Sequence, residues 1–172
     1  MKKLVFLFAS LFITVIAVQN VNAQTSANTS AQTSANIITP IAIQKTVDLV
    51  FGNIVPTANP GTVVLATNGT RSFTGGAFAF ANGTGDPTAA EFNVTGEEDA
   101  TYSITITNSS FDVTNGSETM TINNIVTTPT PTGTLTEGTQ TIKVGATLNV
   151  KANQAPGLYK NENSLEITVA YN

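Results

Sequence analysis

Short segments in which apolar and polar residues alternate recur along most of this chain, and Gly, Pro or Asn separates each from the next. In the clearest, Tyr102, Ile104 and Ile106 share one face. A longer one has its apolar residues on one face at Ile142, Val144, Ala146, Leu148 and Val150. A period of two residues is that of a β-strand with one buried face. No segment has a convincing helical period, so the sequence predicts an all-β fold, an antiparallel β-sandwich of about eight to ten short strands.

Glycine-containing pairs mark turns and close approaches between these strands. Three Asn-Gly pairs stand between strand-like segments, at 68–69, 82–83 and 115–116. Each pair can adopt the positive φ angles that a two-residue type I′ hairpin requires. Gly75 and Gly76 fall inside a loosely alternating segment, which indicates a bulge or a close approach of two backbones.

The start of the chain has the pattern of a secretory signal. Lys2 and Lys3 precede an apolar stretch at 4–18, and small residues then lead to Ala23, as at a signal-peptidase site. The apolar stretch is shorter than the roughly 20 residues that span a bilayer. We therefore expect a cleaved signal peptide at 1–23, and not a membrane anchor.

The next segment, 24–35, repeats Gln, Thr, Ser, Ala and Asn. Small polar residues bury too little apolar surface to order by themselves, so this segment is predicted to be a flexible leader. The remaining residues, 36–172, have a suitable length for one β-sandwich domain.

Composition excludes several classes of function. Without Lys2 and Lys3, five basic residues remain against eleven acidic ones, a net charge of 5 − 11 = −6. This charge argues against nucleic acid and against anionic lipid, both of which need basic partners. The chain has no His, Cys or Trp. Their absence excludes Ser-His-Asp and Cys-His catalysis, metal sites built on imidazole or thiolate, and disulfides. We expect a protein that is not an enzyme, has no metal or cofactor, and does not insert into a membrane.

The acidic residues cluster in one place, at Glu97, Glu98 and Asp99 directly after Gly96. A glycosidase needs two carboxylates that face each other across a cleft, and the spacing here matches no calcium-binding loop. Like charges in a turn between strands are ordinary. We expect a solvated turn, with weak calcium binding as the alternative.

The last alternating segment has one apolar face, formed by Leu165, Ile167, Val169 and Tyr171, and the sequence stops one residue later. With no room for a following strand, this segment is expected to form an edge strand whose unpaired backbone groups and apolar side chains need a cover. A segment of another copy of the protein supplies such a cover by β-strand addition.

The predicted donor of that strand is the segment 36–44. Ile37, Ile41 and Ile43 fall on one face when this segment is extended. Burial of three Ile side chains stabilises an assembly by about 4–9 kcal/mol before entropic costs. Pro40 removes one N–H, which is tolerated where pairing is one-sided. The alternative is that 36–44 is the first strand of its own domain.

Three stretches carry a resemblance to a known family. They read LVFGNI at 49–54; FNVTG at 92–96 with ATYSI at 100–104; and VGATL at 144–148 with NQAPGLY at 153–159 and VAYN at 169–172. Over residues 46–172 the chain resembles a family of secreted bacterial domains of unknown function. That family is related to spore coat protein U and to the major subunit of Mat-type common pili. The lack of Cys is similar to the cysteine-free branch of that family.

The resemblance implies an immunoglobulin-like, pilin-like sandwich. It also implies secretion with the help of a periplasmic chaperone and an outer-membrane usher. In pilins of this type the chaperone holds the C-terminal strand, which assigns that role here to Leu165, Ile167, Val169 and Tyr171.

The expected function is a non-enzymatic structural subunit of a secreted bacterial surface fibre or adhesive layer. It would assemble by β-strand addition with copies of itself or related subunits, and pass through the periplasm to the cell surface. The alternative is a monomeric secreted binding module, for example for carbohydrate. Such a module needs an aromatic platform, which three Tyr and no Trp make hard to build.

Overall fold

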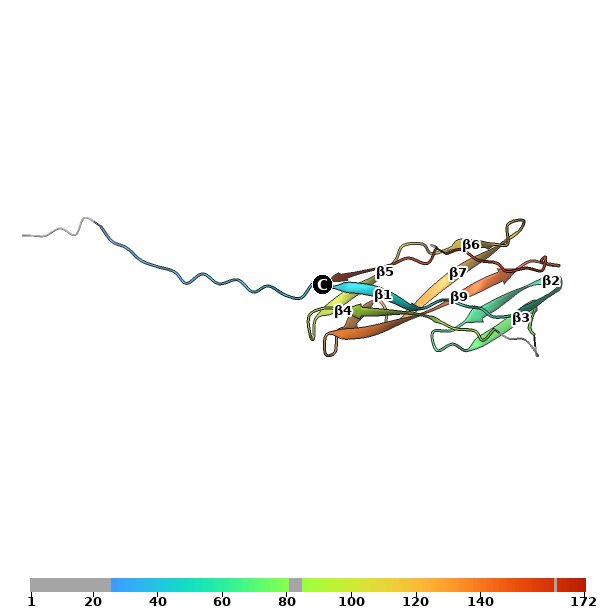
Figure 1. Cartoon of the computed structure of the whole chain (residues 1–172), viewed down its shortest axis with the longest axis horizontal. Coiled ribbons are helices and arrows are strands. Elements are labelled where there is room, and N and C mark those ends of the chain that lie inside the picture. Colours follow the sequence, from blue (N-terminus) through green and yellow to red (C-terminus); the bar gives the residue numbers. More distant parts are fainter. Residues whose placement is uncertain (1–25, 81–84, 163) are drawn as a thin grey trace, which may run out of the picture. The chain divides into compact units, whose positions relative to one another are not determined.

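The computed structural model describes residues 26–80, 85–162 and 164–172. These residues form ten β-strands and no helix (Figure 1). The strands are β1 (Ala42–Val47), β2 (Ile54–Leu65), β3 (Arg71–Ala79), β4 (Ala90–Thr95), β5 (Thr101–Ile106), β6 (Phe111–Thr114), β7 (Thr119–Thr128), β8 (Thr132–Thr134), β9 (Thr139–Val150) and β10 (Ile167–Tyr171). The predicted all-β class is confirmed. In the same ranges no helix is long and apolar enough to cross a membrane.

The strands form two antiparallel sheets in a sandwich-like arrangement, as the alternation predicted. The larger sheet has the order β1-β4-β9-β2-β3, and β7 pairs with both β9 and β6. The smaller sheet has the order β10-β5-β8. Strand β9 is the centre of the larger sheet because it pairs with β4, β2 and β7.

The pattern of β9 explains its central place. Ile142, Val144, Ala146, Leu148 and Val150 are all buried. Because every second side chain along β9 is apolar and buried, other apolar side chains must cover this face along its whole length. The predicted apolar face of this segment is therefore confirmed.

Two apolar clusters lie along β9. The first gathers side chains of β2, β3, β6, β7 and β9, with Val63 and Leu65 the most buried. The second lies between the two sheets and contains Tyr102, Leu135 and Ile142, each 0% exposed. The interior therefore consists of two clusters. Of these, only the second contacts side chains of both the first strand, β1, and the last, β10.

Hairpins lie at two of the three Asn-Gly pairs. They join β2 to β3 at 68–69 and β6 to β7 at 115–116, whereas 82–83 lies outside the described residues. The type I′ geometry is wrong for these two hairpins, because only the glycine of each pair has a positive φ, +82° and +97°. The asparagine instead bonds the turn with its side chain: Asn68 Oδ1 accepts the N–H of Thr70 at 3.0 Å.

The glycine pair in β3 makes the predicted close approach. Gly75 has a φ of +63°, and the pairing of β2 with β3 shifts register between Pro56 and Gly61. A Cβ atom on Gly76 would lie 1.9 Å from the carbonyl oxygen of Asn59. The residues of β2 at this register shift, 57–60, therefore pack directly on Gly76.

The segment that follows the first strand is irregular. β1 ends at Val47, and Leu49 and Phe51 then pack into the interior from an irregular segment. Val50 forms only an isolated bridge with Thr88. Alternating burial is therefore kept here without regular pairing.

Candidate functional site: the seam between the terminal strands

The C-terminal strand β10 lies at the edge of the smaller sheet. It pairs with β5, with Val169 opposite Ile104 and Tyr171 opposite Tyr102. Its other side has no partner strand in the parts of the chain that the structure describes. Ile167 is buried, whereas Val169 and Tyr171 are only half-buried.

The N-terminal strand β1 lies at the edge of the larger sheet. It pairs with β4, with Ile43 opposite Val94. Ile43, and Ile41 just before the strand, are half-buried and pack against the second apolar cluster.

We call the half-buried apolar side chains along these two edges the terminal seam: Ile41, Ile43, Leu165, Val169 and Tyr171. All five pack on one cluster from two different sheets. Both flanking strands have one unpaired edge in the ranges described. An unpaired edge offers backbone donors and acceptors, and half-buried side chains offer apolar area, so the terminal seam has what an added extended segment needs.

The predicted donor residues take different places. Ile41 and Ile43 lie in the terminal seam of their own domain, which is the arrangement of an ordinary first strand. Ile37 is 94% exposed and outside the seam. Donation to another copy stays a prediction, and Ile37 is the residue of the three that the domain leaves unburied.

The two ends of the domain meet at a small polar cluster. The hydroxyl of Tyr171 accepts the N–H of Glu97 and donates to the carbonyl oxygen of Thr39, both at 2.7 Å. The N–H of Thr39 donates to Glu97 Oε2, also at 2.7 Å. In Figure 1 the C-terminus accordingly lies at the start of β1. Gly96 leaves room for this contact, because a Cβ there would lie 2.2 Å from the Tyr171 hydroxyl.

The acidic turn is therefore more than the solvated turn that the sequence predicted. The hydrogen bond from the Thr39 N–H holds the pKa of Glu97 below its ordinary value. Glu98 and Asp99 are exposed. Across the described ranges no three acidic or other ligand side chains gather in a way that would hold a metal ion.

The lowered pKa gives a pH dependence. A carboxyl with a depressed pKa in the folded state stabilises above its unfolded pKa, and that contribution is lost as the pH falls through the folded pKa. We expect the stability of the native chain to fall more steeply below pH 4.5, the ordinary value for this group, than that of Glu97→Gln. Urea unfolding from pH 7 to pH 3 measures the difference. Glu98→Gln, which alters an exposed neighbour, is the control and should follow the native curve.

Removal of the tyrosine hydroxyl should loosen the start of β1. Tyr171→Phe deletes two hydrogen bonds of the polar cluster. We expect a loss of about 1–2 kcal/mol in stability and faster amide exchange at Glu97. Amide exchange followed by NMR measures both the stability of the domain and the exchange rate at Glu97. Unchanged exchange at Glu97 would contradict the bond. Tyr159→Phe is a control, because its hydroxyl bonds Ala155, outside the seam.

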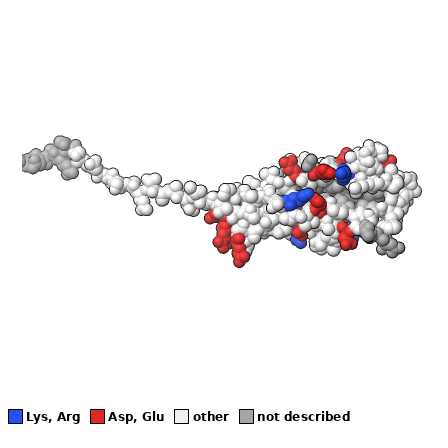
Figure 2. Space-filling view, in the orientation of Figure 1, with Lys and Arg blue, Asp and Glu red and all other residues white. Residues whose placement is uncertain are grey.

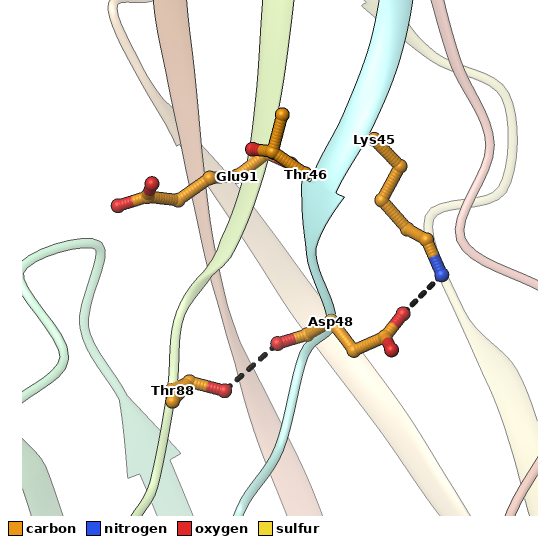
Figure 3. A network of polar contacts seen from close by, with 5 residues as sticks. All are labelled: Lys45, Thr46, Asp48, Thr88 and Glu91. Atoms are coloured by element: carbon orange, nitrogen blue, oxygen red, sulfur yellow. Dashed lines mark hydrogen bonds and ion pairs between the residues drawn. The ribbon is translucent and has the colours of Figure 1, made fainter.

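The far end of β1 is also fixed to its own domain, as Figure 3 shows. The hydroxyl of Thr88 donates to the carbonyl oxygen of Asp48 at 2.9 Å, and that of Thr46 donates to the carbonyl oxygen of Glu91 at 3.2 Å. Lys45 forms an ion pair with Asp48. With the polar cluster at its start and these bonds at its end, β1 is held at both ends.

The structure shows an apolar surface that sequence reasoning missed. Val55 of β2 lies opposite Phe78 of β3, and both are exposed, as is Phe80. Along β3 the side chains of Phe73 and Ala77 pack in the interior, so alternation places Phe78 on the outer face.

A shallow groove of about 400 Å³ crosses the larger sheet beside this surface. Its walls include Thr62, Thr74, Thr121, Asn149 and Lys151. No aromatic side chain lines it. Pro60 and Val150 line it as well, so the groove combines hydroxyl and amide groups with apolar surface.

Fold and seam together define a β-sandwich domain with unpaired edges at its terminal strands. The chain belongs to the family described as a domain of unknown function (DUF4402), whose model matches residues 41–171. The match thus begins at the residue before β1 and ends with β10. Comparisons with curated proteins and with solved structures found no match.

Proposed function

We propose that this protein is a non-enzymatic structural subunit of a secreted bacterial surface fibre or adhesive layer. Copies of it, or related subunits, join by β-strand addition: an extended segment of one copy pairs with the unpaired edge of β10 in the next. The subunit passes through the periplasm and ends at the cell surface.

The observation that carries this proposal is the terminal seam. Strand β10 has one unpaired edge and borders apolar side chains that are only half-buried. A strand added beside it would pair with that edge and cover those side chains. Backbone pairing supplies affinity in such complexes, and side chains that fit between neighbours supply specificity.

Sequence features support the same function. The signal-like start at 1–23 favours export, although it lies outside the described residues. The resemblance to the relatives of spore coat protein U and of Mat-type pilins favours a route through a periplasmic chaperone and an outer-membrane usher. In that route a chaperone would cover Leu165, Ile167, Val169 and Tyr171 until the next subunit arrives.

The test is the oligomeric state of the exported chain, beginning at Gln24. We expect a ladder of oligomers on unheated denaturing gels that collapses to one band after boiling, and a molar mass by light scattering that rises with concentration. A monomer at every concentration, with one melting temperature throughout, would contradict the proposal.

The shallow groove on the larger sheet favours a second candidate, a monomeric binding module for a neutral carbohydrate. Thr62, Asn149 and Lys151 present hydroxyl, amide and ammonium groups to one shallow space. If the chain stays monomeric, titration with neutral oligosaccharides should broaden NMR signals of Thr62 and Asn149. Signals that stay unchanged would remove this candidate.

A further inference from the structure

Part of the outer face of the larger sheet carries a row of uncharged polar side chains from strand to strand. Thr62 of β2 lies opposite Thr74 of β3 on one side and opposite Asn149 of β9 on the other. Asn149 in turn lies opposite Thr121 of β7. These side chains point outward, because their neighbours along each strand pack in the first apolar cluster.

We call the outer side of β2, β3, β7 and residues 145–150 of β9 the neutral face. Strands β2 and β7 contain no charged residue. In β3 the guanidinium of Arg71 donates to the carbonyl oxygen of Asn53 at 3.2 Å. Lys143 of β9 lies before residue 145 and pairs with Glu91 of β4. Figure 2 shows few coloured side chains over β2 and β3, whereas acidic ones gather at the other end of the domain, near the turn between β4 and β5.

The neutral face has exposed aromatic side chains at one end and a groove further along β3. Phe78 is 54% exposed, as is Phe80, one residue after β3. The groove holds about 400 Å³, and its walls include the apolar surface of Pro60 and Val150. Phe78 lies about 13 Å along the strand from Thr74 in the groove wall. Exposed aromatic side chains and a lack of charge are the composition of the centre of a protein interface.

We infer that the neutral face packs against the neutral face of a second copy, with Phe78 of each copy in the groove of the other. A two-fold contact brings together the same surface of both copies. A chain that has both an exposed aromatic side chain and a groove is therefore complementary to itself. This contact is separate from the strand addition proposed above: strand addition extends a row of copies, and the neutral face holds neighbouring rows side by side.

Charge favours a second copy as the partner. The exported chain has five basic residues against eleven acidic ones, so two copies repel each other wherever acidic surfaces meet. On the neutral face neither copy brings a charge. The residues at its border, Lys151 beside the groove and Asp112 opposite Thr121, have opposite signs. Two copies can therefore approach each other here without repulsion.

The area of the neutral face is sufficient for such a contact. Strands lie about 4.8 Å apart and rise about 3.3 Å per residue, so this face covers on the order of 500 Å² in each copy. Two copies together then bury about 1,000 Å², the lower limit for a specific interface. One contact alone is therefore weak, and its repetition along a row of copies strengthens it.

The polar side chains of the neutral face already have partners. The hydroxyls of Thr62 and Thr74 share a hydrogen bond of 2.6 Å, and Asn149 Nδ2 donates to the carbonyl oxygen of Thr121 at 3.0 Å. A polar group that keeps its hydrogen bond loses little when water leaves. A second copy can therefore cover these groups, and it would close the groove to the carbohydrate considered above.

The test uses two variants of the exported full chain, each of which damages one half of the contact. Phe78→Ser removes the aromatic side chain and leaves the groove. Thr74→Glu places a carboxylate in the groove wall and leaves Phe78. Thr105→Glu, at an exposed position of β5 in the smaller sheet, is the control. Sedimentation velocity in native buffer measures association. Unheated denaturing gels of the same samples report the ladder separately, because detergent dissolves contacts between packed side chains.

Each variant alone should associate at least about tenfold more weakly than the native chain, because each contact loses two buried aromatic side chains or gains two buried carboxylates. Thr105→Glu should associate as the native chain does. A mixture of Phe78→Ser and Thr74→Glu should associate more tightly than either variant alone, since Phe78 of one chain then meets the intact groove of the other. The ladder should be the same in all samples.

Several results would overturn the contact: variants that associate like the native chain, a mixture no tighter than its components, or equal weakening by Thr105→Glu. A native chain that sediments no faster than its ladder predicts would also overturn it. None of these results touches the proposed function, which the ladder tests separately. Association that responds to the variants as expected, but without a ladder, removes the proposed function and keeps the contact. Thr74→Glu alters an exposed position and should keep the native melting temperature, which separates lost contact from unfolding.

Discussion

Tyr102→Ala should remove about 3–5 kcal/mol of stability, the range for a large aromatic side chain removed from a core. Tyr102 is the largest side chain with no exposed surface. It stands on β5 between the two sheets, and its hydroxyl donates to Gln140 Oε1 of β9 at 2.7 Å. The same oxygen accepts the N–H of Thr134 at 3.0 Å. One residue thus joins β5, β8 and β9, and its loss opens a cavity and removes one of these links. Chemical denaturation measures the change.

Tyr102→Phe separates the two parts of that effect. It keeps the ring and removes the hydroxyl, so we expect a loss of about 1–3 kcal/mol. If Tyr102→Ala costs less than Tyr102→Phe, the account of this residue as the packed centre of the second cluster is wrong.

Gly76→Ala should be the other severe substitution, with a loss of about 3 kcal/mol, at the upper end for overpacking. The added Cβ would lie 1.9 Å from the carbonyl oxygen of Asn59 and 2.3 Å from the hydroxyl of Thr57. Both atoms belong to the residues of β2 at the register shift, so β2 and β3 must separate to make room for the added methyl group. The φ of Gly76 is not positive, so the effect is purely one of space. Thermal unfolding measures it.

Gly69→Ala is the matched control. Gly69 has a φ of +82° and nothing within 4 Å of an added Cβ. Only backbone strain of about 1 kcal/mol is expected. Equal losses for the two substitutions would show that the tight contact at Gly76 does not limit stability.

Patterns within one strand were sufficient to predict much of the fold. The alternation from Ile142 to Val150 predicted a strand with one apolar face, although not its central place in the sheet, and Gly75-Gly76 predicted a bulge or a close approach of two backbones. Both are local: a period of two fixes which face is buried whatever lies opposite. The prediction of type I′ turns was wrong, because the Asn side chain itself accepts an N–H of the turn, as Asn68 does from Thr70.

The candidate site was less accessible from sequence. An extended segment with one apolar face fits an edge of its own domain or that of a neighbour equally well, so Ile41 and Ile43 could not be placed by pattern. The polar cluster joins Thr39, Glu97 and Tyr171, residues 58, 74 and 132 apart, and only the folded chain brings them together.

The most direct measurement is disulfide trapping between copies, since the native chain contains no Cys. One full chain carries Asn36→Cys or Ile38→Cys, on either side of the predicted donor residue Ile37, and a second carries Ala170→Cys, whose side chain is exposed on β10. Side chains of paired strands on the same side lie about 4.5–5.5 Å apart at Cβ, within disulfide range. Because Ile37 would face the terminal seam, cysteines at 36 and 38 should link to Ala170→Cys in mixed dimers, and Ile37→Cys on the opposite side should not. No mixed dimer from position 36 or 38, or equal linking from both sides, would contradict strand addition by the predicted donor segment.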